Sequence, residues 1–141
     1  MIVPDLNLLV YAHNTGAPFH ERAKEWWEDL INGQERVGVP WAVVTGFVRL
    51  MTHPRVLTSP VAPSVAMSYV SEWFSFPHVA RLNPGSNHLS YFRQNLIDAG
   101  VGGNLVTDCH IAALAMEYQA ELHSNDTDFS RFSGLRWRNP L

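Results

Sequence analysis

The sequence predicts a three-layer α/β/α sandwich with a central, mainly parallel sheet of four to five strands. Short apolar segments alternate along the chain with longer segments whose apolar residues recur at helical spacing. This alternation is typical of a parallel sheet covered by helices on both faces. No repeat, low-complexity run or long linker divides the 141 residues, and this length suits one core. We therefore expect a single domain over residues 1–141.

The first expected elements follow from the apolar pattern and from the proline and glycine residues at which its segments end. Residues 1–3 form an apolar run that ends at Pro4-Asp5, which indicates a buried strand, and residues 6–13 have a helical pattern. Residues 19–32 give the clearest helix, because their apolar side chains fall on one face and their charged side chains mostly on the other. Gly33 is a plausible end for this helix.

The middle of the chain repeats the order of strand and helix. Residues 36–39 predict a second strand, and residues 41–52 predict a helix that begins after Pro40 and ends before Pro54. Residues 64–74 predict another helix, with a proline near its start.

The last third predicts three more strands and two helices. A flexible glycine turn is expected at residues 100–103, between the two helices. The expected strands are residues 78–82, 120–124 and 135–138, and the expected helices are residues 87–99 and 107–119.

Four of the six aspartates lie where a parallel sheet would bring them together. Asp5 follows the first expected strand, Asp126 and Asp128 follow the strand at 120–124, and Asp108 begins the preceding helix. In such sheets ligands bind beyond the carboxyl ends of the strands. Each aspartate alone also has a structural explanation, as a helix cap or a turn residue.

Carboxylates held this close need protons or a cation. Two like charges 4 Å apart repel by about 4 kcal/mol at an effective dielectric constant of 20. Mg²⁺ and Mn²⁺ prefer carboxylate and water oxygens, and such an ion can assist hydrolysis of a phosphodiester. The acids therefore suggest a metal-dependent site at this edge of the sheet.

Composition limits the other possibilities. The net charge of −3 excludes a generally basic nucleic-acid binder, and a lone cysteine, Cys109, excludes a disulfide framework or a multi-cysteine zinc site. Only 16% of the residues are charged, so part of the apolar surface is expected to serve an interface. No apolar stretch reaches membrane-spanning length, and Asp5 comes too early for a signal peptide. These features predict a cytoplasmic protein with no membrane contact.

Three motifs together resemble the PIN domain family. They are VPDLNLL around Asp5, TDCHIAALA around Asp108, and SNDTDF, which contains Asp126 and Asp128. Each motif is weak alone, but their order and spacing fit a PIN domain over essentially the whole chain.

This resemblance implies a metal-dependent nuclease. It assigns Asp5, Asp108 and Asp126 as the catalytic acids that bind Mg²⁺ or Mn²⁺, with Asp128 in support. Short bacterial members are mostly VapC toxins of type II toxin–antitoxin systems, which cleave RNA as homodimers and are inhibited by a VapB antitoxin. The resemblance therefore implies an RNA substrate, a VapB-type antitoxin, a homodimer and a bacterial cytoplasmic location. The implied reaction is hydrolysis that leaves a 5′-phosphate and a 3′-hydroxyl.

One position departs from the family pattern. The family often carries a glutamate on the helix after the second strand, near Thr45 or Gly46 here, and neither residue is acidic. Thr45 is a candidate to supply a hydroxyl ligand or to hold a metal-bound water. Asn7 and Arg49 are further candidates to support the site or to bind substrate, Arg49 through a phosphate. For all three, a purely structural or surface role remains an alternative.

Three other functions remain alternatives. The missing glutamate is compatible with a degenerate PIN domain that binds RNA or its antitoxin without efficient cleavage. The acids do not distinguish RNA from DNA, since contacts to the 2′-hydroxyl would do that. An aspartyl-phosphate phosphatase is disfavoured, because Asp5-Leu6-Asn7 lacks the second acid of such a motif.

Overall fold

A five-stranded parallel sheet forms the centre of the molecule. The structure is a computed structural model that describes residues 1–100 and 102–141. The strand order is β3-β2-β1-β4-β5, and every neighbouring pair is parallel. The strands are β1 (Ile2–Pro4), β2 (Val37–Pro40), β3 (Val79–Leu82), β4 (Glu121–His123) and β5 (Arg136–Arg138). The predicted fold class and strand number are confirmed.

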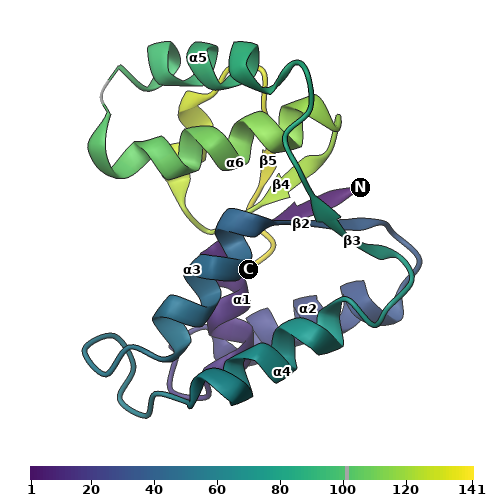
Figure 1. Cartoon of the computed structure of the whole chain (residues 1–141), viewed down its shortest axis with the longest axis vertical. Coiled ribbons are helices and arrows are strands. Elements are labelled where there is room, and N and C mark those ends of the chain that lie inside the picture. The colour runs from purple at the N-terminus through teal and green to yellow at the C-terminus, as the bar shows by residue number, and fades with distance from the viewer. Residues whose placement is uncertain (101) are drawn as a thin grey trace.

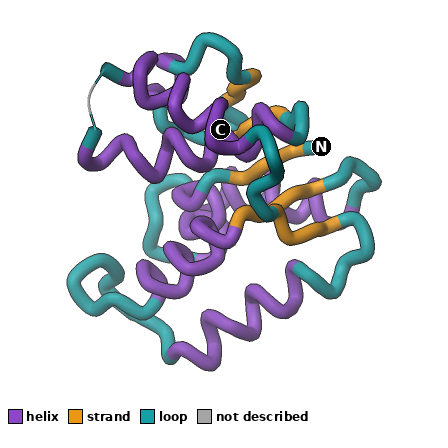
Figure 2. Tube along the Cα trace, turned by 45° about the horizontal axis from the view of Figure 1, so that its top comes forward, coloured by secondary structure: helices purple, strands orange, loops and turns teal. Residues whose placement is uncertain are grey.

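Helices cover both faces of this sheet. Figure 1 shows α5 and α6 on one side of the strands and the group α1 to α4 on the other. Figure 2 shows the strands side by side between these two groups. The helices are α1 (Leu6–His13), α2 (His20–Asn32), α3 (Trp41–Met51), α4 (Pro63–Trp73), α5 (His88–Ala99) and α6 (Val106–Glu117). All the predicted helices are present, and their ends lie within two residues of the prediction.

The described residues between α5 and α6 form a glycine helix end and a short 3₁₀ helix. Gly100 ends α5 in the left-handed region, with φ 71°, and its N–H donates to the carbonyls of Leu96 and Ile97. Glycine favours this conformation because it lacks a Cβ. A short 3₁₀ helix, η1 (Gly103–Leu105), then leads into α6. The glycine turn predicted at 100–103 includes Val101, which lies outside the described residues.

The three central strands, β2, β1 and β4, are mostly buried, as expected for a parallel sheet between helices, whereas the edge strand β5 is largely exposed. Val3, Val37, Val39 and Leu122 are each 0% exposed. Cys109 is also 0% exposed and packs in the core as a small apolar group.

An aromatic cluster fills the core between α1, α3 and α4. The ring centroids of Phe47 and Trp73 lie 4.6 Å apart, and both side chains pack against the His13 ring. Trp73 Nε1 donates to His13 Nε2 over 3.2 Å, and His13 Nδ1 pairs with the Leu9 carbonyl at 2.8 Å. Burial lowers the pKa of His13, so this histidine is a neutral core residue.

Within the described chain, none of the helices combines the length and apolar character needed to cross a lipid bilayer.

Candidate metal centre

The carboxyl edge of the sheet gathers acids from three segments. β1 and β4 are neighbours in register, with Pro4 opposite His123, and the Asp5 N–H continues this pairing by donating to the His123 carbonyl at 2.9 Å. Asp126 follows β4 after two residues. A tight turn joins the end of α6 to the start of β4, so the first turn of α6, which carries Asp108, lies at the opposite, carboxyl edge. The sequence-based placement of these acids is therefore confirmed.

Three of the carboxylates form a compact cluster. One oxygen each from Asp108, Asp126 and Asp128 lies within 4.8 Å of the other two, and all three side chains are partly exposed. Asp126 caps the 3₁₀ helix η2 (Thr127–Arg131), because its Oδ1 accepts from the Asp128 N–H at 2.8 Å. This turn brings Asp128 into the cluster, whereas the resemblance to PIN domains gave it only a supporting role.

Asp5 lies below this cluster and is almost fully buried, at 4% exposure. Its Oδ1 accepts from the Leu6 N–H at 2.8 Å, and its Oδ2 accepts from the Ser124 hydroxyl at 2.7 Å. Both oxygens are thus engaged within the protein. Its place among the direct metal ligands stays a prediction, and its contacts show that it caps α1.

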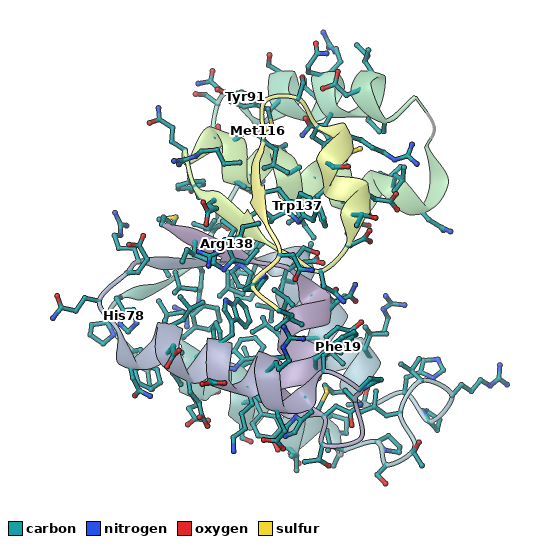
Figure 3. The ribbon with its side chains drawn as sticks, turned by 180° about the vertical axis from the view of Figure 1, so that it is seen from behind. Phe19, His78, Tyr91, Met116, Trp137 and Arg138 are labelled. Atoms are coloured by element: carbon teal, nitrogen blue, oxygen red, sulfur yellow. The ribbon has the colours of Figure 1, made fainter. Side chains whose placement is uncertain are left out.

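Ser124 is the residue of the site that sequence reasoning missed. It is 0% exposed, and its hydroxyl donates to Asp5 while accepting from the Asp126 N–H at 3.0 Å. Its carbonyl accepts from Nε1 of Trp137 at 3.0 Å, a β5 residue labelled in Figure 3. Ser124 therefore ties two acid-bearing segments together. The available signal was a serine two residues before Asp126, a spacing typical of side-chain to backbone turns.

Replacing Ser124 by alanine is expected to destabilise the protein by about 1–3 kcal/mol, because it leaves Asp5 Oδ2 and the Asp126 N–H without partners. Denaturant unfolding measures this loss. Ser130→Ala is the matched control, since the Ser130 hydroxyl is exposed and donates only to the Thr127 carbonyl. Equal, small losses in both variants would show that the buried hydroxyl does not hold the site together.

The electrostatics of the site favour a bound cation. Burial, followed by repulsion from Asp5, Asp126 and Asp128, raises the pKa of Asp108 to about 7. Burial also raises the pKa of Asp5, against the opposing effects of its hydrogen bonds to Ser124 and Leu6. Without a cation, these carboxyls retain protons well above the pH at which an exposed aspartate loses one.

The donor set suits Mg²⁺ or Mn²⁺. Oxygens bound to one Mg²⁺ at 2.0–2.1 Å lie at most about 4.2 Å apart, so small side-chain rotations bring the three cluster oxygens to that spacing. All three donors are carboxylates, the ligand type that hard divalent ions prefer. The residues present therefore fit the ion that the sequence motifs imply.

A cation from the protein itself also reaches the cluster. Arg131 Nε lies 3.3 Å from Asp128 Oδ1, and both side chains are about half exposed.

The remaining candidate residues from the sequence are less directly connected to the acid cluster. In the described residues no hydrogen bond joins Asn7, Thr45 or Arg49 to a cluster acid, so their roles stay predictions.

Gly46, at the position where the family often carries a glutamate, packs closely against α1. A Cβ at Gly46 would lie 2.8 Å from Leu6 Cδ2, because α3 packs there directly on the first turn of α1. A side chain at this position would therefore require the Leu6 side chain to shift. Thr45 is exposed, and its hydroxyl donates to the Ala42 carbonyl at 3.3 Å, which is an ordinary contact within a helix.

The histidines form no second metal centre with three or more ligands in the part of the chain that the structure describes. His110 pairs with His88 at 2.9 Å, between α5 and α6. His123 accepts from Trp26 Nε1 at 3.0 Å and pairs with Glu121 at 2.8 Å. These contacts give the three histidines structural pairings with neighbouring residues.

Comparison with known sequences agrees with the motifs. A family model for the PIN domain matches residues 2–135. The chain is 46% identical over 141 residues to Ribonuclease VapC33 of Mycobacterium tuberculosis, covering all of this chain and 99% of the relative. It is 37% identical over 140 residues to Ribonuclease VapC37 of the same species, covering 99% of this chain and 97% of that one.

Solved structures show the same fold at low sequence identity. The crystal structure of Mycobacterium tuberculosis VapC20, described as a sarcin–ricin loop cleaving toxin, gives a TM-score of 0.70 at 17% identity and covers 96% of this chain and 99% of that one. A chain of VapBC2 from Rickettsia felis, bound to a promoter DNA fragment, gives a TM-score of 0.69 at 20% identity, with 99% and 98% covered.

Proposed function

Because this chain belongs to the PIN domain family, and within it to the VapC ribonucleases, we propose that it is a metal-dependent endoribonuclease and the toxin of a type II toxin–antitoxin system. The observation that carries the proposal is the cluster of Asp108, Asp126 and Asp128 at the carboxyl edge of the sheet. Curated relatives named as ribonucleases match the chain over essentially its full length, which supports the same activity here.

We assign the residues as follows. Asp108, Asp126 and Asp128 hold a divalent ion, Mg²⁺ or Mn²⁺, and Asp5 sits beneath them with Ser124 to fix the two strand ends. When bound, such an ion neutralises charge on the phosphate and lowers the pKa of an attacking water. Asp126 also orders the turn that presents Asp128, through its bond to the Asp128 N–H. This arrangement explains how a protein of net charge −3 acts on a polyanion.

We also propose a VapB-type antitoxin and a second copy of this chain as partners, in the bacterial cytoplasm. The fold neighbours include toxin chains from VapBC assemblies, which supports the antitoxin. Exposed apolar side chains such as Leu89 and Ile97, each 65% exposed, support a protein–protein interface. Light scattering on the purified protein tests the homodimer.

Purified, antitoxin-free protein is expected to cut RNA at discrete positions in Mg²⁺ or Mn²⁺ and to leave it intact in EDTA. Structured and unstructured RNAs are incubated in each condition, with a DNA of matching sequence alongside. Asp126→Asn is expected to abolish cutting because it removes a ligand, and Asp29→Asn, an exposed aspartate on α2, is the control that keeps it. The products are expected to carry a 5′-phosphate and a 3′-hydroxyl.

The outcomes of this assay distinguish the proposed function from its alternatives. Cleavage that persists in EDTA or in Asp126→Asn would refute the metal-dependent site. A 2′,3′-cyclic phosphate product would refute hydrolysis by water. If no RNA is cleaved, calorimetric Mn²⁺ binding that depends on Asp5 would indicate an enzyme with a narrow RNA target, and absence of Mn²⁺ binding would favour the degenerate alternative.

A further inference from the structure

Arg131 is the one Arg or Lys that pairs with a carboxylate of the acid cluster among the described residues. Its Nε contacts Asp128 Oδ1 at 3.3 Å, from the last residue of η2. A 3₁₀ helix repeats every three residues, so residues 128 and 131 lie on the same edge of it. The pairing therefore follows from the local backbone.

Two buried phenylalanines fix the segment that presents this arginine. Phe129 is 1% exposed and Phe132 is 2% exposed, and their rings pack edge to face with centroids 6.0 Å apart. The Ser130 hydroxyl also donates to the Thr127 carbonyl at 2.7 Å. The backbone at Arg131 is thus anchored from both sides, while its side chain remains 48% exposed at the mouth of the cluster.

Only part of the Arg131 guanidinium is engaged by the described residues of the protein. Its Nε is engaged by Asp128, and no hydrogen bond from its two Nη groups is present among the described residues. A guanidinium presents its N–H groups in a planar fork that matches phosphate oxygens. An RNA strand that binds at this acidic edge of the sheet carries such phosphate oxygens along its backbone.

We propose that Arg131 is a substrate-binding residue, whose guanidinium contacts a backbone phosphate of the RNA strand as it enters the acid cluster. This inference rests on the proposed ribonuclease function. Asp128 orients the side chain through Nε and leaves the outer edge of the fork for the phosphate. The acid cluster takes the cation, and the arginine beside it takes the phosphate.

The test separates RNA binding from metal binding. A short fluorescent single-stranded RNA is titrated in EDTA with Asp108→Asn protein, which cannot bind the ion and repels RNA less. Adding Arg131→Ala to this protein is expected to weaken RNA binding about tenfold. It is also expected to make the slope of log affinity against log salt shallower by about 0.7, the value for one phosphate contact on a single strand.

Three comparisons make the result specific. Arg36→Ala removes the same charge from an exposed position at the opposite edge of the sheet and is expected to leave RNA affinity unchanged. Arg131→Lys keeps the charge but loses the fork, so it is expected to restore binding only in part. In the otherwise unchanged protein, Arg131→Ala is expected to leave calorimetric Mn²⁺ affinity unchanged or up to about fivefold tighter, because a competing cation is removed.

Opposite results would overturn the proposal. Weaker Mn²⁺ binding with unchanged RNA binding would make Arg131 a structural partner of Asp128. Full rescue by Arg131→Lys, or an equal loss of RNA affinity in Arg36→Ala, would show a general charge effect. If Asp108→Asn protein does not bind the RNA at all, RNA is not the ligand of Arg131. None of these readouts uses cleavage, so failure of the ribonuclease proposal itself is recognised separately in the metal-dependent assay.

Discussion

Asp108→Asn is expected to stabilise the metal-free protein at pH 8 while abolishing Mn²⁺ binding and lowering RNA cleavage at least about 100-fold. The two effects have opposite signs because the carboxylate that we propose binds the ion is costly to ionise without it. Asparagine keeps the shape of the side chain and removes the charge.

The pH dependence follows from the raised pKa. The Asp108 carboxyl titrates at about 7 in the folded protein and at about 3.9 when unfolded. Between these values the folded state binds the proton more tightly, so the metal-free protein loses stability as the pH rises from about 4 to about 7, and the loss is complete above 7. Because Asp108 is only half buried, we expect the loss to be about 1–2 kcal/mol after solvent screening.

Thermal and denaturant unfolding in EDTA across pH 4–8 measure this effect. The advantage of Asp108→Asn over the unchanged protein is expected to appear at pH 8 and to vanish near pH 4. Mn²⁺ at 100 times its Kd is expected to stabilise the unchanged protein by about 2.7 kcal/mol and the variant far less. The control Asp29→Asn is expected to behave as the unchanged protein does. If Asp108→Asn is less stable than the unchanged protein in EDTA at pH 8, the assigned electrostatics are wrong.

Trp73→Ala is expected to destabilise the fold by about 3–5 kcal/mol, a large part of the total stability of a typical domain. Trp73 is 1% exposed, and its ring packs against Phe47, Trp27 and His13. Its removal opens a cavity among these rings and takes away the donor to His13 Nε2.

Denaturant unfolding measures this loss of stability. In thermal unfolding, the Tm of the same variant is expected to fall by about 10 °C. Trp41→Ala is the matched control, because Trp41 is 46% exposed and the same deletion there removes much less buried surface. Mn²⁺ affinity of folded Trp73→Ala is expected to stay near normal, since the aromatic cluster lies at the far end of α1 from Asp5. Similar losses for both tryptophans would contradict the assigned core.

The fold class and the edge of the sheet at which the acids meet could both be predicted from the sequence. Alternating strands and helices specify a parallel sheet, and parallel strands necessarily place their carboxyl ends at one edge. Asp5 and Asp126 follow neighbouring strands for that reason. The helix ends were predicted less closely, as in α6, because terminal turns depend on local capping that the apolar pattern does not encode.

The arrangement of the acids relative to one another is visible only in the folded structure. The motifs gave Asp5 and Asp128 the roles of ligand and supporter, but the fold buries Asp5 against Ser124, while η2 turns Asp128 into the cluster. Side-chain direction after a strand depends on the turn that follows it, and this turn is set by the hydrogen bonds of Ser124 and Asp126. The partnership of Arg131 with Asp128 arises from the same turn, since a residue pair three apart meets only if the backbone there is helical.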